Sequence, residues 1–240
     1  FLKENNLKVL LKPDLTDIRV SELFLDGRIP EWLHRDLRLF LDQADYPLAV
    51  RSSSLLEDAQ YRPYAGIYST YMIPNNHKDF QKRLTLLEQA IKLVYASTFM
   101  EASRSYGSSS LYRVEDEKMA VVIQQLMGTS YGDHFYPAIS GVARSYNFYP
   151  ISYMKPEEGI AYVALGLGKT VVEGGKALRF SPHYPQLLPQ FSTVEDILKN
   201  SQRFFYALKM TGVSDDLALD ENASLARLEV DDAVSDKPVQ

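Results

Sequence analysis

The sequence has 240 residues, of which 45% are apolar and 24% charged, as in an ordinary globular protein with a sizeable core. Its net charge of −5 argues against a nucleic-acid-binding surface, and no apolar run reaches the ~18 residues that a membrane span requires. The lack of cysteine excludes disulfides, thiolate metal sites and cysteine nucleophiles. We therefore expect no nucleic-acid partner, no membrane contact and a cytoplasmic location.

The chain begins at Phe1 and shows no signal-peptide pattern. We expect it to be a fragment of a longer polypeptide, whose flanking parts supply further pieces of the site.

The first 45 residues are predicted to be mainly helical. Pro30 suits the first turn of a helix, where its missing N–H would be unpaired in any case. The apolar residues that follow recur at helical spacing: Trp32, Leu33, Leu37, Phe40 and Leu41. Residues 46–53 predict a strand that runs into a loop, and residues 66–73 alternate as a second strand.

A long helix is predicted over residues 78–99, with Asn75 and Asn76 as candidate caps. Its apolar stripe consists of Leu84, Leu87, Ile91, Val94 and Tyr95. Residues 103–110 are rich in Ser and Gly and predict a loop.

Strands dominate from residue 118 onward. Four are predicted between Gly, Pro and Asn signals: 118–126, 138–145, 159–165 and 178–180. Ser192 and Glu195 have capping-box spacing before a helix over 194–208. From residue 214 the chain carries eight acids against Arg227 and Lys237, which indicates a partly mobile tail with a short strand at 225–230.

These elements predict an α+β fold with two lobes. A helix-rich N-terminal lobe covers residues 1–110, a sheet-rich C-terminal lobe covers 111–213, and the acidic tail covers 214–240. A cleft between two such lobes is a common place for a nucleotide.

One set of motifs has a characteristic order and spacing. VRSS (residues 50–53) is followed by ED (57–58) and AG (65–66). Further blocks come later: AVVIQQLMG (120–128), SGVARSYN (140–147) and GLGKTVVEG (166–174). Together they resemble the N-terminal ATP-binding domain of phosphoenolpyruvate synthases and pyruvate phosphate dikinases, over roughly residues 46–182.

The resemblance implies an ATP-grasp-like fold with a mainly antiparallel C-terminal lobe. It also implies a phosphotransferase that binds ATP with Mg²⁺ and passes phosphoryl to a histidine on a separate domain. The phosphohistidine and phosphoenolpyruvate/pyruvate domains would lie elsewhere in the full-length chain.

Arg51 stands at the end of a predicted strand, beside the hydroxyls of Ser52 and Ser53. A planar guanidinium can bind phosphate oxygens in a bidentate manner, and the hydroxyls and loop amides can add donors. The alternative is that Arg51 pairs with Glu57 or Asp58 across its own loop. With the family spacing we favour phosphate contact, and we assign Arg51 a catalytic role.

The segment Gln124, Gln125, Leu126 and Met127 ends an apolar strand. The resemblance makes it the strand and hinge that hold adenine, with backbone N–H and C=O groups at the base edge and Leu and Met over the ring faces. The alternative is an ordinary core strand, and the same residue types suit both.

The GLGKT segment is not a Walker phosphate loop, because Val163 occupies the position of the first glycine. Nor does it complete G-x-G-x-x-G, since Val171 takes the third place. The glycines therefore indicate a tight turn or a close backbone approach. Lys169 is a candidate phosphate ligand, with a solvated turn lysine as the alternative.

Several acidic positions of the family are altered. The glutamate of its GLGE motif is Lys169 here, and the glutamine of VV-Q-G is Glu173. An acid of the preceding strand is Ala161 or Tyr162, and a further Glu is Ser69. Magnesium bound with a triphosphate takes one or two carboxylates. Glu173 and Asn147 are the candidates, and Glu173 equally suits pairing with Lys169 or Lys176.

The family carries a phosphate-contacting arginine near the Ser/Gly segment. Arg104 is our candidate over Arg113, and we give it a catalytic role, with a surface ion pair as the alternative. Arg144 replaces an aromatic residue of the family, which hints at a changed nucleotide contact or a partner.

The family's Gly-Gly-Lys loop is expected before Phe1, and no histidine of the chain lies in the phosphohistidine motif. The chain alone therefore cannot complete the family reaction. A second hypothesis is a degenerate nucleotide-sensing or regulatory domain without phosphotransfer, and a third is a scaffold that binds no nucleotide.

Overall fold

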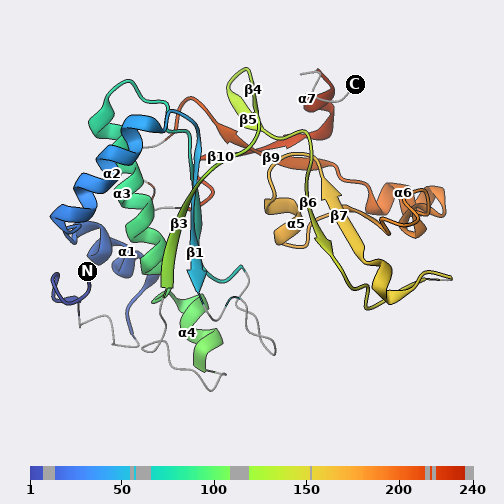
Figure 1. Cartoon of the computed structure of the whole chain (residues 1–240), viewed down its shortest axis with the longest axis horizontal. Coiled ribbons are helices and arrows are strands. Elements are labelled where there is room, and N and C mark those ends of the chain that lie inside the picture. The colour runs from blue at the N-terminus through green and yellow to red at the C-terminus, as the bar shows by residue number, and fades with distance from the viewer. Residues whose placement is uncertain are drawn as a thin grey trace. The chain divides into compact units, whose positions relative to one another are not determined.

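The computed structural model of the chain forms two compact units (Figure 1). Unit 1 comprises Phe1–Leu126 and Gly212–Ser224, and unit 2 comprises Met127–Thr211 and Leu225–Gln240. The structure describes residues 1–7, 14–54, 57, 66–108, 119–151, 153–213, 217 and 220–235.

Unit 1 is built on a three-stranded antiparallel sheet with the order β2-β1-β3. Its strands are β1 (Leu48–Ser54), β2 (Thr70–Ile73) and β3 (Met119–Gln125). The predicted lobes divide at residue 110, whereas the units divide after Leu126, because β3 pairs with β1 along the whole length of that strand.

Helices cover one face of this sheet (Figure 1). They are α1 (Asp17–Asp26), α2 (Glu31–Gln43) and α3 (Phe80–Ser97), and α4 (Glu101–Ser108) follows α3. Leu48 and Val50 of β1 are fully buried against the α3 residues Leu84, Leu87 and Val94. Alternation along β1 therefore turns Arg51 and Ser53 to the opposite, exposed face.

Most predicted elements of unit 1 are confirmed, with shifted boundaries. Residues 66–73 form a strand only from Thr70. Trp32, one of the apolar residues at helical spacing in α2, is 59% exposed. The cap of α3 is Asp79, whose carboxylate accepts from Gln81 N at 2.8 Å. Asn75 instead donates to the carbonyls of Ala44 and Tyr46.

The loop prediction for residues 103–110 is wrong for 103–108, which belong to α4. Two side-chain contacts explain the helix. Asp17 Oδ1 accepts from Glu101 N at 2.8 Å in the first turn, and the buried Ser103 hydroxyl donates to Ser97 O at 2.6 Å. Serine side chains that bond to the backbone in this way can stabilise the start of a helix, although a Ser-rich composition by itself predicts a loop.

Unit 2 contains two antiparallel sheets. One has the order β10-β9-β5-β4 and the other β6-β7-β8. The strands are β4 (Thr129–Tyr131), β5 (His134–Tyr136), β6 (Ser140–Arg144), β7 (Ile160–Ala164), β8 (Leu178–Phe180), β9 (Phe204–Lys209) and β10 (Leu225–Glu229). The helices are η3 (Pro156–Glu158), α5 (Lys169–Val172), η4 (Pro189–Phe191), α6 (Val194–Asn200) and α7 (Val230–Ser235). The first sheet buries Tyr136 and Phe205, whose rings lie 4.8 Å apart.

The predicted helix over 194–208 is wrong beyond Asn200. Residues 204–209 form β9, in which Phe205 and Ala207 are buried while Phe204 is exposed. This alternation has the period of a strand, and the chain turns to an extended conformation at Ser201. The cap of α6 is Thr193, paired with Asp196, instead of Ser192 with Glu195.

The described part of the acidic tail contains regular structure. The predicted strand at 225–230 is confirmed as β10, which pairs with β9, and α7 follows it. Upstream of β10, Glu221 belongs to unit 1 and accepts from Thr70 N at 3.2 Å.

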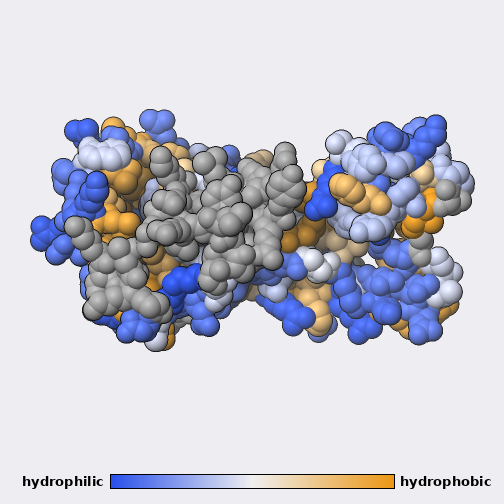
Figure 2. Space-filling model, turned by 90° about the horizontal axis from the view of Figure 1, so that it is seen from below, coloured by the Kyte–Doolittle hydropathy of each residue, from blue (hydrophilic) through white to orange (hydrophobic). Residues whose placement is uncertain are grey.

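The mixture of helices and antiparallel sheets confirms the α+β class. Hydrophobic side chains appear in small groups among hydrophilic ones on the face shown in Figure 2. In the described part of the chain, no helix has the length and apolar character needed to span a membrane.

Candidate functional site

Arg51 lies on the exposed face of β1, opposite Thr70 of β2 and Val122 of β3. Its Nε donates to Gln124 Oε1 at 3.3 Å, and a terminal nitrogen lies 3.5 Å from Ser52 O. No carboxylate in the described ranges forms an ion pair with it. Gln124 therefore orients a guanidinium that faces solvent.

The loop-pairing alternative for Arg51 depends on two acids. Glu57 is held elsewhere, because its carboxylate accepts from the Ser52 hydroxyl at 2.5 Å and from Ser54 N at 2.9 Å. Asp58 lies outside the described residues. The buried Ser52 is thus committed to Glu57, whereas Ser53 is exposed on the same face as Arg51.

The predicted adenine hinge contains the boundary between the units, which falls between Leu126 and Met127. Gln124 and Gln125 end β3 with exposed side chains, and Met127 is 70% exposed. The Leu126 N–H donates to Pro47 O at 2.8 Å. That amide is therefore engaged within unit 1, and Met127 is the apolar side chain that the segment exposes most.

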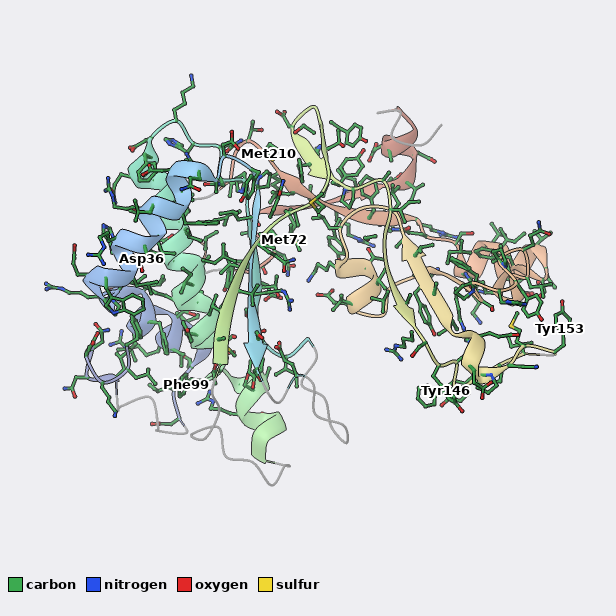
Figure 3. All side chains as sticks on the ribbon, in the orientation of Figure 1. Asp36, Met72, Phe99, Tyr146, Tyr153 and Met210 are labelled. Carbon is green, nitrogen blue, oxygen red and sulfur yellow. The ribbon has the colours of Figure 1, made fainter. Side chains whose placement is uncertain are left out.

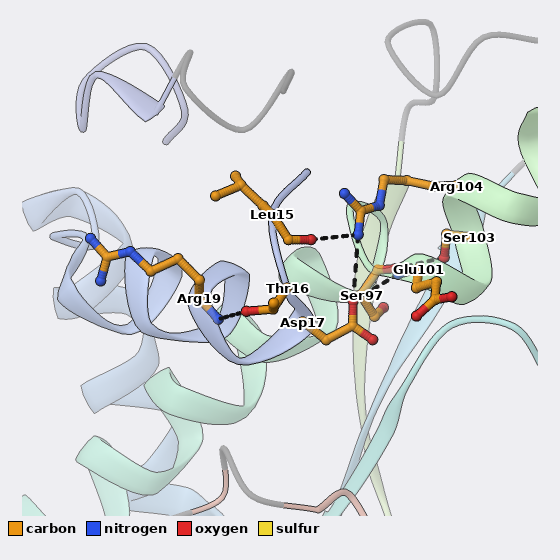
Figure 4. A network of polar contacts seen from close by, with 8 residues as sticks. All are labelled: Leu15, Thr16, Asp17, Arg19, Ser97, Glu101, Ser103 and Arg104. Atoms are coloured by element: carbon orange, nitrogen blue, oxygen red, sulfur yellow. Dashed lines mark hydrogen bonds and ion pairs between the residues drawn. The ribbon is translucent and has the colours of Figure 1, made fainter. Parts of the chain in front are cut away.

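Arg104 belongs to α4 and is tied to the start of α1 (Figure 4). A terminal nitrogen donates to Leu15 O at 2.7 Å and lies 3.8 Å from Asp17 Oδ1. The same carboxylate caps Glu101 N. The arrangement favours the structural alternative for Arg104, and Arg113 lies outside the described residues.

The GLG turn of unit 2 requires its first glycine. Gly166 has a φ of 83°, and a Cβ there would lie 2.6 Å from the ring of Phe205 and 2.7 Å from Tyr206 O. The Leu167 N–H donates to the same Tyr206 carbonyl at 2.8 Å. The glycine therefore permits the close backbone approach that the sequence indicated, which seats α5 against β9.

Lys169 opens α5 and forms an ion pair with Glu173 one turn later. Its ammonium also lies 5.7 Å from the centre of the Tyr206 ring. The side chain of Lys169 is 13% exposed and that of Glu173 49%. Lys169 was a candidate phosphate ligand and Glu173 a candidate metal ligand, but the structure shows the two paired with each other. The pair neutralises the only carboxylate of the GLGKTVVEG block.

Arg144 ends β6 opposite Ile160 and is exposed. Asn147 follows and is buried, with 4% of its surface exposed. Its Oδ1 accepts from Tyr149 N at 3.1 Å, and its own N–H donates to Pro156 O at 2.7 Å. Asn147 therefore stabilises the turn after β6.

Magnesium was predicted to bind Glu173 and Asn147. The first is paired with Lys169, and the side-chain oxygen of the second already accepts a backbone hydrogen bond. No group of three or more His, Asp or Glu residues in the described ranges is placed to hold a metal ion. The two residues do not fit a magnesium site in this arrangement, and that prediction rests on the resemblance alone.

The sequence model of one family, the AMP/ATP-binding domain of pyruvate phosphate dikinase, matches residues 3–232. The chain belongs to this family. The match identifies the chain as an AMP/ATP-binding domain of the dikinase type, and the resemblance inferred from the VRSS, SGV and GLG blocks is confirmed at the family level.

A relative of this dikinase-type domain is a Bacillus subtilis (strain 168) protein described as an uncharacterized phosphotransferase, YvkC. It is 29% identical over 127 residues, which cover 53% of this chain. The match spans only 13% of the length of the relative.

Two residues of the dikinase-type domain were missed by sequence reasoning. Tyr206 supplies both the ring beneath Lys169 and the carbonyl that holds the GLG turn. It lay inside a predicted helix, so only recognition of the strand period at 204–209 would have found it. Glu57 was considered as a partner of Arg51, but not as the acceptor for Ser52.

Proposed function

We propose that this chain is the nucleotide-binding part of a phosphotransferase that passes phosphoryl from ATP to a histidine on a separate domain. The observation that carries the proposal is the exposed Arg51 guanidinium, which Gln124 orients and no described carboxylate neutralises. Arg51 lies in a block that the family shares, and bidentate donation to phosphate oxygens is a use for which such a guanidinium is well suited.

In the proposed step, a neutral imidazole nitrogen of the histidine attacks a phosphorus atom of ATP. An N–P bond forms as the bond from that phosphorus to the bridging oxygen on its nucleotide side breaks, and the nucleotide product leaves with that oxygen. The part of this chain is positioning and charge stabilisation, with Arg51 and the exposed Ser53 hydroxyl as donors to the phosphates. The final acceptor, pyruvate or another small molecule, would be served by domains outside this chain.

The second candidate function is a nucleotide sensor without phosphotransfer. The Lys169–Glu173 pair favours it, because the block offers no free carboxylate to a metal ion bound with the triphosphate. In this case the domain keeps its ATP affinity, and the signal is the binding event itself.

The test is a search for phosphohistidine in the full-length protein after incubation with magnesium and ATP. The proposal predicts an acid-labile, base-stable phosphoryl group that is abolished in Arg51→Ala and retained in Arg35→Ala. Arg35 provides a matched control, because its side chain is 71% exposed on α2. Nucleotide binding without any phosphohistidine would overturn the transfer proposal in favour of the sensor. If the protein neither binds nucleotide nor forms phosphohistidine, the scaffold hypothesis is favoured.

A further inference from the structure

A pocket lies in unit 2 at the β7–β8 edge of its smaller sheet. Ile160 of β7 and Phe180 of β8 form its floor, and other walls come from Ile151, Met154, Leu187 and Gln190. Its volume is about 120 Å³. The pocket is formed by residues of unit 2 alone, and Lys169 and Glu173 do not line it.

The pocket contains a buried hydroxyl that lacks a partner. Ser181 follows β8 and is 3% exposed. Its Oγ forms no hydrogen bond with any residue that the structure describes, although its carbonyl accepts from Tyr184 N at 3.0 Å. Burying a hydroxyl without a hydrogen bond costs stability, so a group of this kind in a pocket wall is available to donate to a ligand that carries an acceptor.

The charge of the pocket is positive. Arg179 of β8 is the only charged residue among the described residues that line it. A terminal nitrogen donates to Tyr149 O at 3.3 Å, and no carboxylate in the described ranges pairs with the guanidinium. The Gln190 amide accepts from Arg179 N at 3.1 Å and donates to Ala177 O at 3.2 Å, and so fixes the backbone of the strand that carries Arg179 and leads to Ser181.

The remaining walls are apolar, formed by Ile151, Met154 and Leu187 together with the floor. An aromatic contact joins two of the segments that supply these walls. Tyr153, in the same loop, stands edge-on to Tyr184 with ring centres 5.0 Å apart. Tyr153 and Tyr146 both extend from the connection between β6 and β7 (Figure 3). The connection that carries Ile151 and Met154 is thus tied to the segment that follows β8.

We propose that this pocket binds a small monocarboxylate with a short aliphatic tail. One guanidinium and one hydroxyl match a single carboxylate, and the apolar walls match the tail. A cavity of 150 Å³ is known to hold benzene, so about 120 Å³ suits a ligand of about six non-hydrogen atoms. A phosphate dianion would leave the apolar walls unused and one charge uncompensated, and a nucleotide is too large.

The proposal is tested by titrating the full chain, labelled at its methionine methyl groups, with butyrate. We expect a saturable shift of the Met154 methyl resonance in the NMR spectrum. Butyramide, which has nearly the same shape but no charge, should bind at least tenfold more weakly. Equal affinity for the two compounds, or no saturable shift at Met154, would overturn the proposal.

Two variants separate ligand binding from a structural role. Ser181→Ala removes a hydroxyl that has no described partner, so the Tm of the ligand-free chain should be unchanged or higher while butyrate affinity falls at least threefold. Arg179→Gln should abolish the preference for butyrate over butyramide. If Ser181→Ala binds butyrate as the wild type does, or Arg179→Gln keeps the preference, the assignment fails. Neither result depends on ATP, so failure here is distinct from failure of the phosphotransfer proposal.

Discussion

Single residues determine whether the GLG turn can form. Gly166 combines a φ of 83° with backbone and ring atoms less than 3 Å from the position of a Cβ, whereas Gly168 has a φ of −57° and no atom within 4 Å. We predict that Gly166→Ala lowers the free energy of unfolding by about 2–4 kcal/mol, the sum of backbone strain and overpacking. Gly168→Ala should change it by less than about 0.5 kcal/mol. Urea denaturation of both variants checks this, and equal effects would contradict the close approach.

Tyr71 makes the stability of unit 1 depend on alkaline pH. Burial, and to a smaller extent the Glu221 carboxylate, raises the pKa of its hydroxyl from 10.0 to about 12, although a hydrogen bond with Ser69 opposes the rise. Between these values the unfolded chain loses the proton while the folded chain keeps it. Stability should therefore fall as pH rises from about 10 to 12, by at most ~1.4 kcal/mol per pH unit from this residue.

The variant Tyr71→Phe isolates this contribution. We predict that it unfolds with a shallower loss of stability above pH ~10 than the wild type, in urea titrations at a series of pH values. The other tyrosines are common to both proteins and cancel in the comparison. Parallel pH profiles would show that Tyr71 ionises as it does in the unfolded chain.

At the scale of elements, α6 depends on its N-terminal cap. Thr193 Oγ1 accepts from Asp196 N at 3.1 Å, and the Asp196 carboxylate accepts from Thr193 N at 3.2 Å. Thr193→Ala should lower stability by about 1 kcal/mol, whereas Thr193→Ser keeps the oxygen and should cost much less. Thermal unfolding of the two variants measures the difference. An undiminished Tm in Thr193→Ala would show that the cap contributes nothing.

Elements with a clear period were predictable from the sequence, and elements set by distant contacts were not. The stripe of α3 and the alternation at the end of β1 carry their own signal. The start of α4 depends on Asp17, which is far away in the chain. The local sequence does not contain this contact, and the serines of α4 alone predicted a loop. Strand β9 was missed because α6 directly precedes it and the two patterns were merged into one helix.

The same distinction applies to the site. Arg51 and the glycines were identified by local spacing, and their exposure or crowding follows from the strands that carry them. The partners that decide their chemistry are Gln124, Tyr206 and the Lys169–Glu173 pair. Of these, only the pairing of Lys169 with Glu173 was anticipated, because it lies within one helical turn. The other partners come from strands far away in the sequence.

At the scale of the whole molecule, the residues predicted to contact nucleotide are divided between the two units. Arg51, Ser53 and Gln124 belong to unit 1, whereas Arg144 and the Lys169–Glu173 pair belong to unit 2. The chain passes between the units after Leu126, after Thr211 and after Ser224. Membership of the dikinase-type family makes ATP the ligand, and our account makes Arg51 the principal phosphate contact among the described residues.

The most direct test of this account is the affinity of the full-length protein for ATP, measured by calorimetric titration in the wild type, Arg51→Ala and Arg35→Ala. Loss of charge-assisted hydrogen bonds worth ~1.5–3 kcal/mol should raise the Kd of Arg51→Ala at least about tenfold. Arg35→Ala, which removes an exposed arginine on α2, should stay within about twofold of the wild type. An unchanged Kd in Arg51→Ala would contradict the central claim that Arg51 holds the phosphates.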